Sequence, residues 1–209
     1  MEQTRTNSYC RVVRTKNDST KVDETIKNWT QGILPVLKKQ KGFMGATLTG
    51  SRKSGNGLTV TYWQSESDMK AARGQVRPEA LKVLANTGGS IVEDDECEVA
   101  LLERFQPAKA GVFVRVTTVQ GDPAQVDKAI SNFKEAIVPS IKKQSGARTA
   151  LFFVNRQTGK TFAGSVWDTE QDLQKSEAVI SALRADAVQK FGGHDPKTEA
   201  FEIYFTEIL

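Results

Sequence analysis

The 209-residue sequence is poor in the side chains that hold metals and disulfides, because it has one histidine and two cysteines. Two cysteines are too few for a disulfide framework, and a lone imidazole leaves too few ligands for a structural zinc ion or a haem. No apolar run approaches the roughly 18 residues of a spanning helix. The polar segment 1–7 also lacks the apolar stretch of a secretory signal. We therefore expect no cofactor, no membrane association and a cytoplasmic location.

The chain does carry enough apolar residues for a folded core. Hydrophobic residues make up 38% of it, and the formal net charge is only +4. A chain with this balance is not expected to be disordered. Its length suits one large domain or two small ones.

An internal repeat organises the sequence. Val22-Asp23 recurs as Val126-Asp127, and at this offset of 104 positions 23 of the 95 residues from Arg11 to Phe105 are identical without a gap. The matches include a proline, a basic stretch, a glycine and a tryptophan: Pro35 and Pro139, Lys38-Lys39-Gln40 and Lys142-Lys143-Gln144, Gly42 and Gly146, and Trp63 and Trp167. Two copies are too few for a solenoid. The sequence therefore predicts a duplicated domain, with one repeat over residues 1–105 and the other over 106–209.

Each repeat is predicted to have the order βαββαβ. Stretches rich in valine, threonine and aromatics indicate first strands at 9–15 and 112–119. Apolar residues at helical spacing from Val22 to Leu37 and from Val126 to Ile141 indicate the first helices. A hairpin, a second helix (68–85 and 171–190) and a last strand (97–105 and 201–209) follow. This is the split βαβ, ferredoxin-like arrangement. Two bare sheet faces on one chain can cover each other, so we expect an internal pseudo-dimer that leaves room for a further homodimer.

Two stretches of the first repeat carry a family resemblance. They are Pro35-Val36-Leu37-Lys38-Lys39-Gln40-Lys41-Gly42-Phe43-Met44-Gly45-Ala46 and, after the hairpin, Tyr62-Trp63-Gln64-Ser65-Glu66. The pattern resembles the antibiotic biosynthesis monooxygenase (ABM) family of the dimeric α+β barrel superfamily. The resemblance implies an α+β fold in which two ferredoxin-like βαββαβ repeats form an intramolecular dimeric α+β barrel. It also implies a ligand pocket between the sheet and the helices of each half.

The resemblance leaves two functions open. The family includes cofactor-free oxygenases of aromatic polyketides, quinol oxygenases and haem-degrading enzymes, and many members without established activity. The second helices lack the tryptophan and histidine of the haem-degrading branch, and Met69 and Leu173 stand where the polyketide oxygenases have a tyrosine. One hypothesis is a cofactor-free monooxygenase-like protein acting on an aromatic or quinone-type small molecule. The other is a non-catalytic small-molecule-binding or stress-related barrel. No catalytic residue is assigned.

Six residues, three from each repeat, are candidates for lining a ligand pocket: Trp63, Trp167, Asn28, Asn132, Arg11 and Arg115. The tryptophans can stack on an aromatic ligand or close the core between the sheet and the second helix. The asparagines lie at the edge of the buried helical stripe, where an amide is unfavourable without a specific role.

The two arginines have both a structural and a functional interpretation. Arg11 is predicted to pair across strands with Glu103, and Arg115 with Glu207, because a charge that faces another sheet needs a partner. Alternatively, each arginine donates to an anionic ligand oxygen.

The remaining motifs favour structural roles. Pro35 and Pro139 are expected to kink the first helices. Cys10 and Cys97 are expected to be buried and free of a disulfide, and His194 to be an exposed loop residue. The third strands lack the aromatic RNP1 pattern of RNA-binding sheets, so no nucleic-acid partner is expected.

Overall fold

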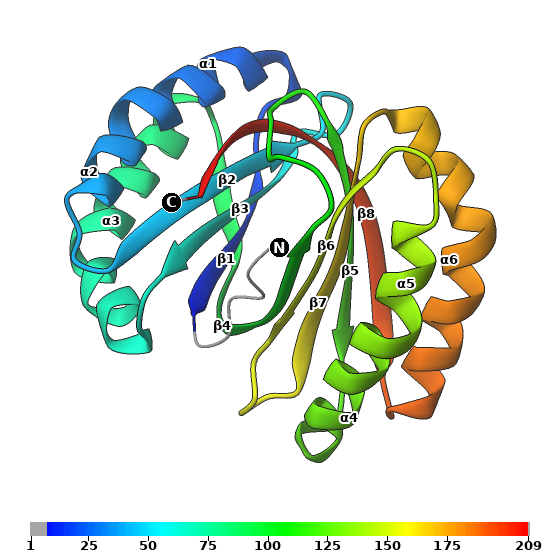
Figure 1. Ribbon diagram of the computed structural model, residues 1–209. Coiled ribbons are helices and arrows are strands. Elements are labelled where there is room, and N and C mark those ends of the chain that lie inside the picture. Colours follow the sequence, from blue (N-terminus) through cyan, green and yellow to red (C-terminus); the bar gives the residue numbers. More distant parts are fainter. Residues whose placement is uncertain (1–7, 209) are drawn as a thin grey trace. The chain divides into compact units, whose positions relative to one another are not determined.

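The computed structural model describes residues 8–208 (Figure 1). The N-terminal segment 1–7 considered above lies outside this range. The described chain divides into two compact units, which we call the first unit (residues 8–96 and 201–208) and the second unit (residues 97–200). None of the described helices is long and apolar enough to cross a membrane.

The first unit contains a five-membered sheet with helices packed on one face (Figure 1). Its elements are β1 (Tyr9–Lys16), a 3₁₀ turn (Ser19–Lys21), α1 (Val22–Asn28), a π-helical turn (Trp29–Ile33), α2 (Leu34–Lys38), β2 (Phe43–Gly50), β3 (Asn56–Trp63) and α3 (Glu66–Asn86). The first half of β4 (Ser90–Arg104) and the second half of β8 (His194–Ile208) complete it. The strand order is β4-β1-β3-β2-β8.

The second unit repeats this plan. Its elements are β5 (Phe113–Gln120), a 3₁₀ turn (Pro123–Gln125), α4 (Val126–Asn132), a π-helical turn (Phe133–Ile137), α5 (Val138–Lys142), β6 (Ala147–Val154), β7 (Lys160–Trp167) and α6 (Glu170–Lys190). Its strand order is β8-β5-β7-β6-β4. The predicted βαββαβ order of both repeats is confirmed.

The compact units and the sequence repeats have different boundaries, because β4 and β8 each give one half to each unit. Both strands are 15 residues long and begin earlier than predicted, at Ser90 and His194. Consequently Glu98 of the first repeat pairs with Arg156 of the second at 2.5 Å, and Glu202 of the second pairs with Arg52 of the first at 3.3 Å. The repeat boundaries 1–105 and 106–209 stay a prediction about the sequence.

Side chains begin the helices as their positions suggest. The Oγ of Ser65 accepts a hydrogen bond from the Asp68 amide at 3.1 Å, and Oγ1 of Thr169 accepts one from the Asp172 amide at 3.0 Å. Each satisfies an amide that has no partner within the helix. Gly42, at φ +72°, ends the first helical segment with a backbone conformation that few other residues adopt.

The two prolines lie in a widened helix. Pro35 is the second residue of α2 and follows the π-helical turn, in which the amide of Leu34 donates to the carbonyl of Trp29. Pro139 has the same place in α5. A proline removes one backbone hydrogen bond and crowds the preceding turn. The wider π-helical turn accommodates this crowding, so the helical segment continues beyond the proline. A kink was predicted here, and the structure has a π-helical turn at this place.

The core of each unit lies between its sheet and its helices. Trp63 is 1% exposed and Trp167 is 0% exposed, and each belongs to a hydrophobic core cluster of its unit. Cys10 and Cys97 are buried, as predicted. His194 is exposed, as predicted, but it begins β8 rather than lying in a loop.

Candidate ligand pocket

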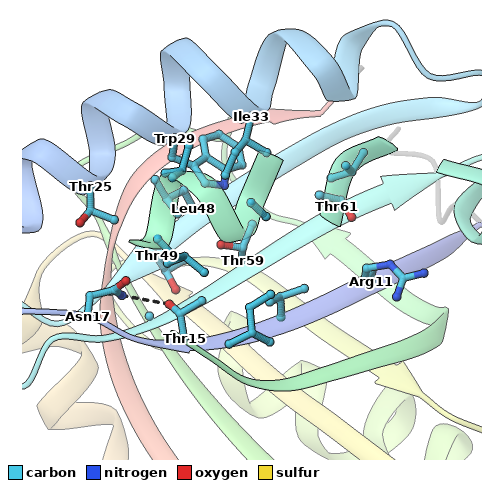
Figure 2. A pocket seen from close by; sticks show the side chains of 18 of the residues that line it. Arg11, Thr15, Asn17, Thr25, Trp29, Ile33, Leu48, Thr49, Thr59 and Thr61 are labelled. Carbon is cyan, nitrogen blue, oxygen red and sulfur yellow. Dashed lines mark hydrogen bonds between the residues drawn. The ribbon is translucent and has the colours of Figure 1, made fainter. Parts of the chain in front are cut away.

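A cavity of about 110 Å³ lies in the first unit between the helices and the sheet. Most of its wall is apolar and comes from the helical segment 22–38, from β2 and from α3. Figure 2 shows Trp29 and Ile33 reaching from the helical segment toward Leu48 on β2. Helical spacing puts Trp29 and Ile33 on one helix face, so the same apolar stripe that builds the core also lines the cavity. The pocket can therefore receive an apolar ring.

One end of this pocket is polar and holds two unsatisfied atoms. The Nδ2 of Asn17 donates to Thr15 Oγ1 at 3.0 Å and to the Gly55 carbonyl at 3.1 Å (Figure 2 draws the former). Its Oδ1 is buried and has no partner, and the same holds for the hydroxyl of Tyr204. Within residues 8–208 these are the two buried side-chain polar atoms without a hydrogen bond. An unpaired buried polar atom is costly, so both need an explanation.

A bulge and two glycines create this polar end. In the pairing of β2 with β8, Leu48 faces Phe205 and Thr49 faces Ile203, so Tyr204 is the extra residue of a bulge. Gly50 and Gly57 face each other on β2 and β3. A Cβ at Gly50 would lie 2.9 Å from Tyr204 Cε2. A Cβ at Gly57 would lie 2.6 Å from Thr15 Oγ1 and 3.2 Å from Asn17 Nδ2. Asn17 Nδ2 and the Tyr204 ring thus lie over two neighbouring glycines, whereas Asn17 Oδ1 lies beside Gly89, where a Cβ would be 2.6 Å away.

The other end of the pocket carries Arg11, which Figure 2 shows at the opposite side from Asn17. Arg11 is 8% exposed, and its Nη1 and Nη2 donate to Asp94 Oδ1 and Glu96 Oε1, each at 2.7 Å. Asp94 also accepts from Arg77 at 2.6 Å and lies 3.2 Å from Arg73. This is a buried arginine held by two carboxylates from β4.

The predicted pairing of Arg11 with Glu103 is wrong. The partners of Arg11 come from residues 90–96, the half of β4 that belongs to the first unit, whereas Glu103 lies in the half that pairs with β6. Glu103 lies 3.5 Å from Lys142 instead. The prediction took the last strand to keep one set of neighbours along its whole length, which a strand shared by two units does not do.

A second cavity, of about 100 Å³, lies in the second unit. Arg115 reaches it from β5 and donates to Ser176 Oγ at 2.7 Å and to the Leu173 carbonyl, while its Nε lies 3.1 Å from Glu177 Oε2. Glu177 also binds Arg184, and this bond lowers the pKa of the carboxyl. Burial lowers the pKa of the Arg115 guanidinium, with the charge of Glu177 opposing the effect.

The predicted pairing of Arg115 with Glu207 is also wrong. Glu207 lies 2.8 Å from Lys38, and both residues belong to the first unit. The reason is the same as for Arg11, since Glu207 is in the half of β8 that pairs with β2.

Four of the six candidate residues line a pocket, and two do not. Arg11 and Trp63 line the first pocket, and Arg115 and Asn132 line the second. Asn28 is partly buried and Trp167 is fully buried, and both lie outside the lining. The indole of Trp63 donates to Thr61 Oγ1 and that of Trp167 to Ser165 Oγ, each at 2.9 Å. A ligand-binding role for any of the six stays a prediction.

Sequence reasoning missed Asn17, Trp29 and Tyr204. Their counterparts in the other repeat are Gly121, Phe133 and Ala100, so the two polar residues are places where the copies differ. Residues that recur in both copies indicate the shared fold and do not indicate these two. Positions where the two copies differ are the feature of the sequence that could have indicated Asn17 and Tyr204.

Size and ligand chemistry limit what the pockets can hold. Pockets for drug-sized ligands usually measure roughly 300–1,000 Å³, so a cavity of about 110 Å³ suits a single ring. Among residues 8–208 no group of three or more histidine, cysteine, aspartate or glutamate side chains is placed to hold a metal ion.

Comparisons with known proteins identify the fold. No protein-family model matches the chain. It is 26% identical over 195 residues to an uncharacterized protein of Mycobacterium tuberculosis, covering 93% of this chain and 87% of that one. The solved structure of an anthrone oxidase-like protein matches with a TM-score of 0.70 at 14% identity, covering 97% and 93% of the two chains. A ferredoxin-fold protein from Listeria monocytogenes, related to antibiotic biosynthesis monooxygenases, matches with a TM-score of 0.53 at 11% identity, covering 95% and 96%.

The order of hydrogen-bonded strands agrees with these matches. It runs β1-β3-β2-β8-β5-β7-β6-β4. The chain has the same ferredoxin-like α+β fold as these solved structures, as the sequence resemblance implied.

Proposed function

We propose that the first-unit pocket binds a small aromatic or quinone-type molecule, and that the protein acts on it as a cofactor-free monooxygenase-like enzyme. The observation that carries this is the pocket itself: an apolar cavity beside Trp29 with a polar group at each end. An apolar wall with few, well-placed polar groups is typical of small-molecule sites.

Trp29 is the side chain best placed to hold a ring. It lines the cavity, is 5% exposed, and its ring centroid lies 5.6 Å from that of Phe205. Aromatic rings in such tilted arrangements attract each other beyond the area they bury. A ligand ring that enters the cavity extends this aromatic contact.

Arg11 supplies the electrostatic part of the proposal. Oxygenation without a metal or flavin needs an electron-rich, anionic form of the substrate, such as a phenolate or an enolate. A guanidinium fixed in advance by Asp94 and Glu96 stabilises negative charge that develops nearby, without having to reorganise.

One observation favours the alternative of a non-catalytic binding protein. Asp94 is the carboxylate that lines the pocket, and it already faces three guanidiniums, those of Arg11, Arg73 and Arg77. Its oxygens are already engaged by these guanidiniums. Binding and oxygenation must therefore be measured separately.

The test uses hydroquinone, which has one ring. Binding is measured by isothermal titration calorimetry, and turnover by oxygen uptake without added metal or flavin. We expect Trp29→Leu to weaken binding by about tenfold or more, because it removes the ring contact. Phe133→Leu, the same position in the second unit, is the matched control and is expected to leave binding unchanged.

The outcomes separate the two functions. Protein-dependent oxygen uptake that is lost in Trp29→Leu supports the oxygenase. Binding without uptake overturns the oxygenase and leaves the binding protein. Absence of binding overturns both.

A further inference from the structure

We infer that the cavity of the second unit binds a small monocarboxylate with an unbranched apolar chain, and that the ligand carboxylate lies at the end lined by Arg115 and Arg184. The inference does not rest on the proposed function, because it concerns the other pocket and another class of ligand.

The arginine end of this cavity has more positive than negative charge. Arg115 is 6% exposed, and its Nε lies 3.1 Å from Glu177 Oε2, while Arg184 donates to both oxygens of the same carboxylate. Among residues 8–208, Glu177 is the carboxylate that pairs with these two arginines. One carboxylate balances one of two guanidiniums. Since a buried charge without a counter-charge is costly, this end of the cavity favours a bound anion.

Both guanidiniums keep N–H groups for a ligand. A guanidinium has five N–H donors. Arg115 uses three of them, for Ser176 Oγ at 2.7 Å, for the Leu173 carbonyl and for Glu177. Arg184 uses two, both for Glu177. A carboxylate matches such donors in shape, and its single charge equals the excess at this end, whereas a phosphate monoester carries about two charges.

The rest of the cavity is narrow and largely apolar. Its wall along β5 consists of alternate residues that share one face and cover about 20 Å of the strand: Arg115, Thr117, Val119 and Gly121. A volume of about 100 Å³ drawn out along this wall suits a short unbranched chain. Phe133 and Phe152 also line the cavity, and they stack on each other with ring centroids 4.7 Å apart. A ring face that is already stacked is not free for a ligand ring, which again favours a chain.

The first unit has different charges at the corresponding place. Arg11 is held there by Asp94 and Glu96, and Asp94 itself lines the pocket. The second repeat has Thr198 and Ala200 at these two positions.

The second cavity has a different source of negative charge. In the part of the chain that the structure describes, the carboxylate in its lining is that of Asp122, which follows β5 and lies at the end away from Arg115. An anion that reaches Arg115 and Arg184 therefore meets no carboxylate in the adjoining described wall. Carboxylate recognition is thus assigned to the second pocket.

The test compares hexanoate with hexanamide, which have nearly the same shape and differ in charge. Their affinities for the full chain are measured by isothermal titration calorimetry at neutral pH. We expect the wild type to prefer hexanoate by about tenfold or more, because hydrogen bonds from a guanidinium to a carboxylate are charge-assisted. In Arg184→Gln this preference should largely disappear while hexanamide still binds. Arg184 is only partly buried, so the variant is expected to fold.

Lys175→Gln is the matched control. It makes the same change of charge on the same helix, α6, but Lys175 is exposed and lies outside the cavity lining. It should keep the full preference for hexanoate. A loss equal to that of Arg184→Gln would reflect the net charge of the protein and would overturn the site.

Two measurements on the wild type complete the test. Equal affinity for hexanoate and hexanamide, or no binding of either, would overturn carboxylate recognition. Hydroquinone should not displace hexanoate, since the two ligands are assigned to different pockets, and displacement would also overturn the assignment. None of these outcomes decides the proposed function, which depends on hydroquinone binding and on its loss in Trp29→Leu.

Discussion

The two units place a buried arginine at the same point of the same fold and surround it differently. Arg11 is held by two carboxylates from the strand β4, whereas Arg115 is held by Glu177 from the helix α6. Glu177 occupies the position of Arg73 in the first repeat, so the sign of the helix charge is reversed. The buried guanidinium is common to both units, and its partners are not. A duplicated scaffold can keep a costly buried charge while exchanging the element that neutralises it.

The pockets of the two units likewise share one part and differ in another. Both have an apolar wall formed by the first helical segment, but only the first has the unsatisfied pair Asn17 and Tyr204. Shared features of the two units therefore report on the fold, and their differences show where the two pockets diverge.

The largest loss of stability is expected at a feature that both units share, the buried tryptophan. Trp63→Ala and Trp167→Ala should each lower the free energy of unfolding by about 3–5 kcal/mol, because each removes a fully buried indole and leaves a cavity. Urea denaturation of both variants checks this. The two losses should match within about 1 kcal/mol. A much smaller loss for Trp63→Ala would show that its side of the core is already loosened by the adjoining pocket.

Substitution of the two buried arginines should lower the free energy of unfolding by different amounts. Arg11→Met removes two charge-assisted hydrogen bonds, to the partly buried Asp94 and Glu96, and should cost about 3 kcal/mol of unfolding free energy. Arg115→Met leaves Glu177 half-exposed and still bonded to Arg184, so about 1 kcal/mol is expected. Denaturation of the two variants side by side measures the difference. Equal costs would contradict the view that the two arginines are neutralised differently.

The predicted βαββαβ order depends on local rules, and other features of the fold depend on them too. The helix caps at Ser65 and Thr169, the stop at Gly42 and the buried tryptophans follow from residue type and spacing. The partners of Arg11 could not be predicted in this way. The 15-residue strand β4 changes its neighbours partway along its length, and the repeat pattern does not indicate where this happens. Tyr204 was missed because a bulge, which alternation of side chains does not reveal, turns it toward the pocket.

The glycine pair offers a smaller and more local test. Gly50→Ala would bring a methyl group to 2.9 Å from the Tyr204 ring, which must move, so a loss of about 1–3 kcal/mol is expected together with weaker hydroquinone binding. The counterpart Val154 is fully buried, and Val154→Ala should also destabilise, by leaving a void rather than by crowding. Calorimetric titration distinguishes them, since only Gly50→Ala should change binding. Unchanged binding in Gly50→Ala would place the ligand away from the Tyr204 end.

The smallest effect is a pH dependence that only the first unit should show. Burial raises the pKa of Tyr204 to about 12 from an ordinary value of 10.0, so the folded chain holds this proton more tightly than the unfolded chain does. The resulting stabilisation is complete below pH 10 and is lost as the pH rises through 12. Because the side chain is only partly buried, the loss should stay under about 1 kcal/mol. Denaturation at pH 9 and pH 11 should therefore show the wild type losing stability relative to Tyr204→Phe, while Tyr9→Phe follows the wild type. Parallel losses in all three proteins would mean that Tyr204 ionises like an exposed tyrosine, and the polar end of the pocket would then be open to water.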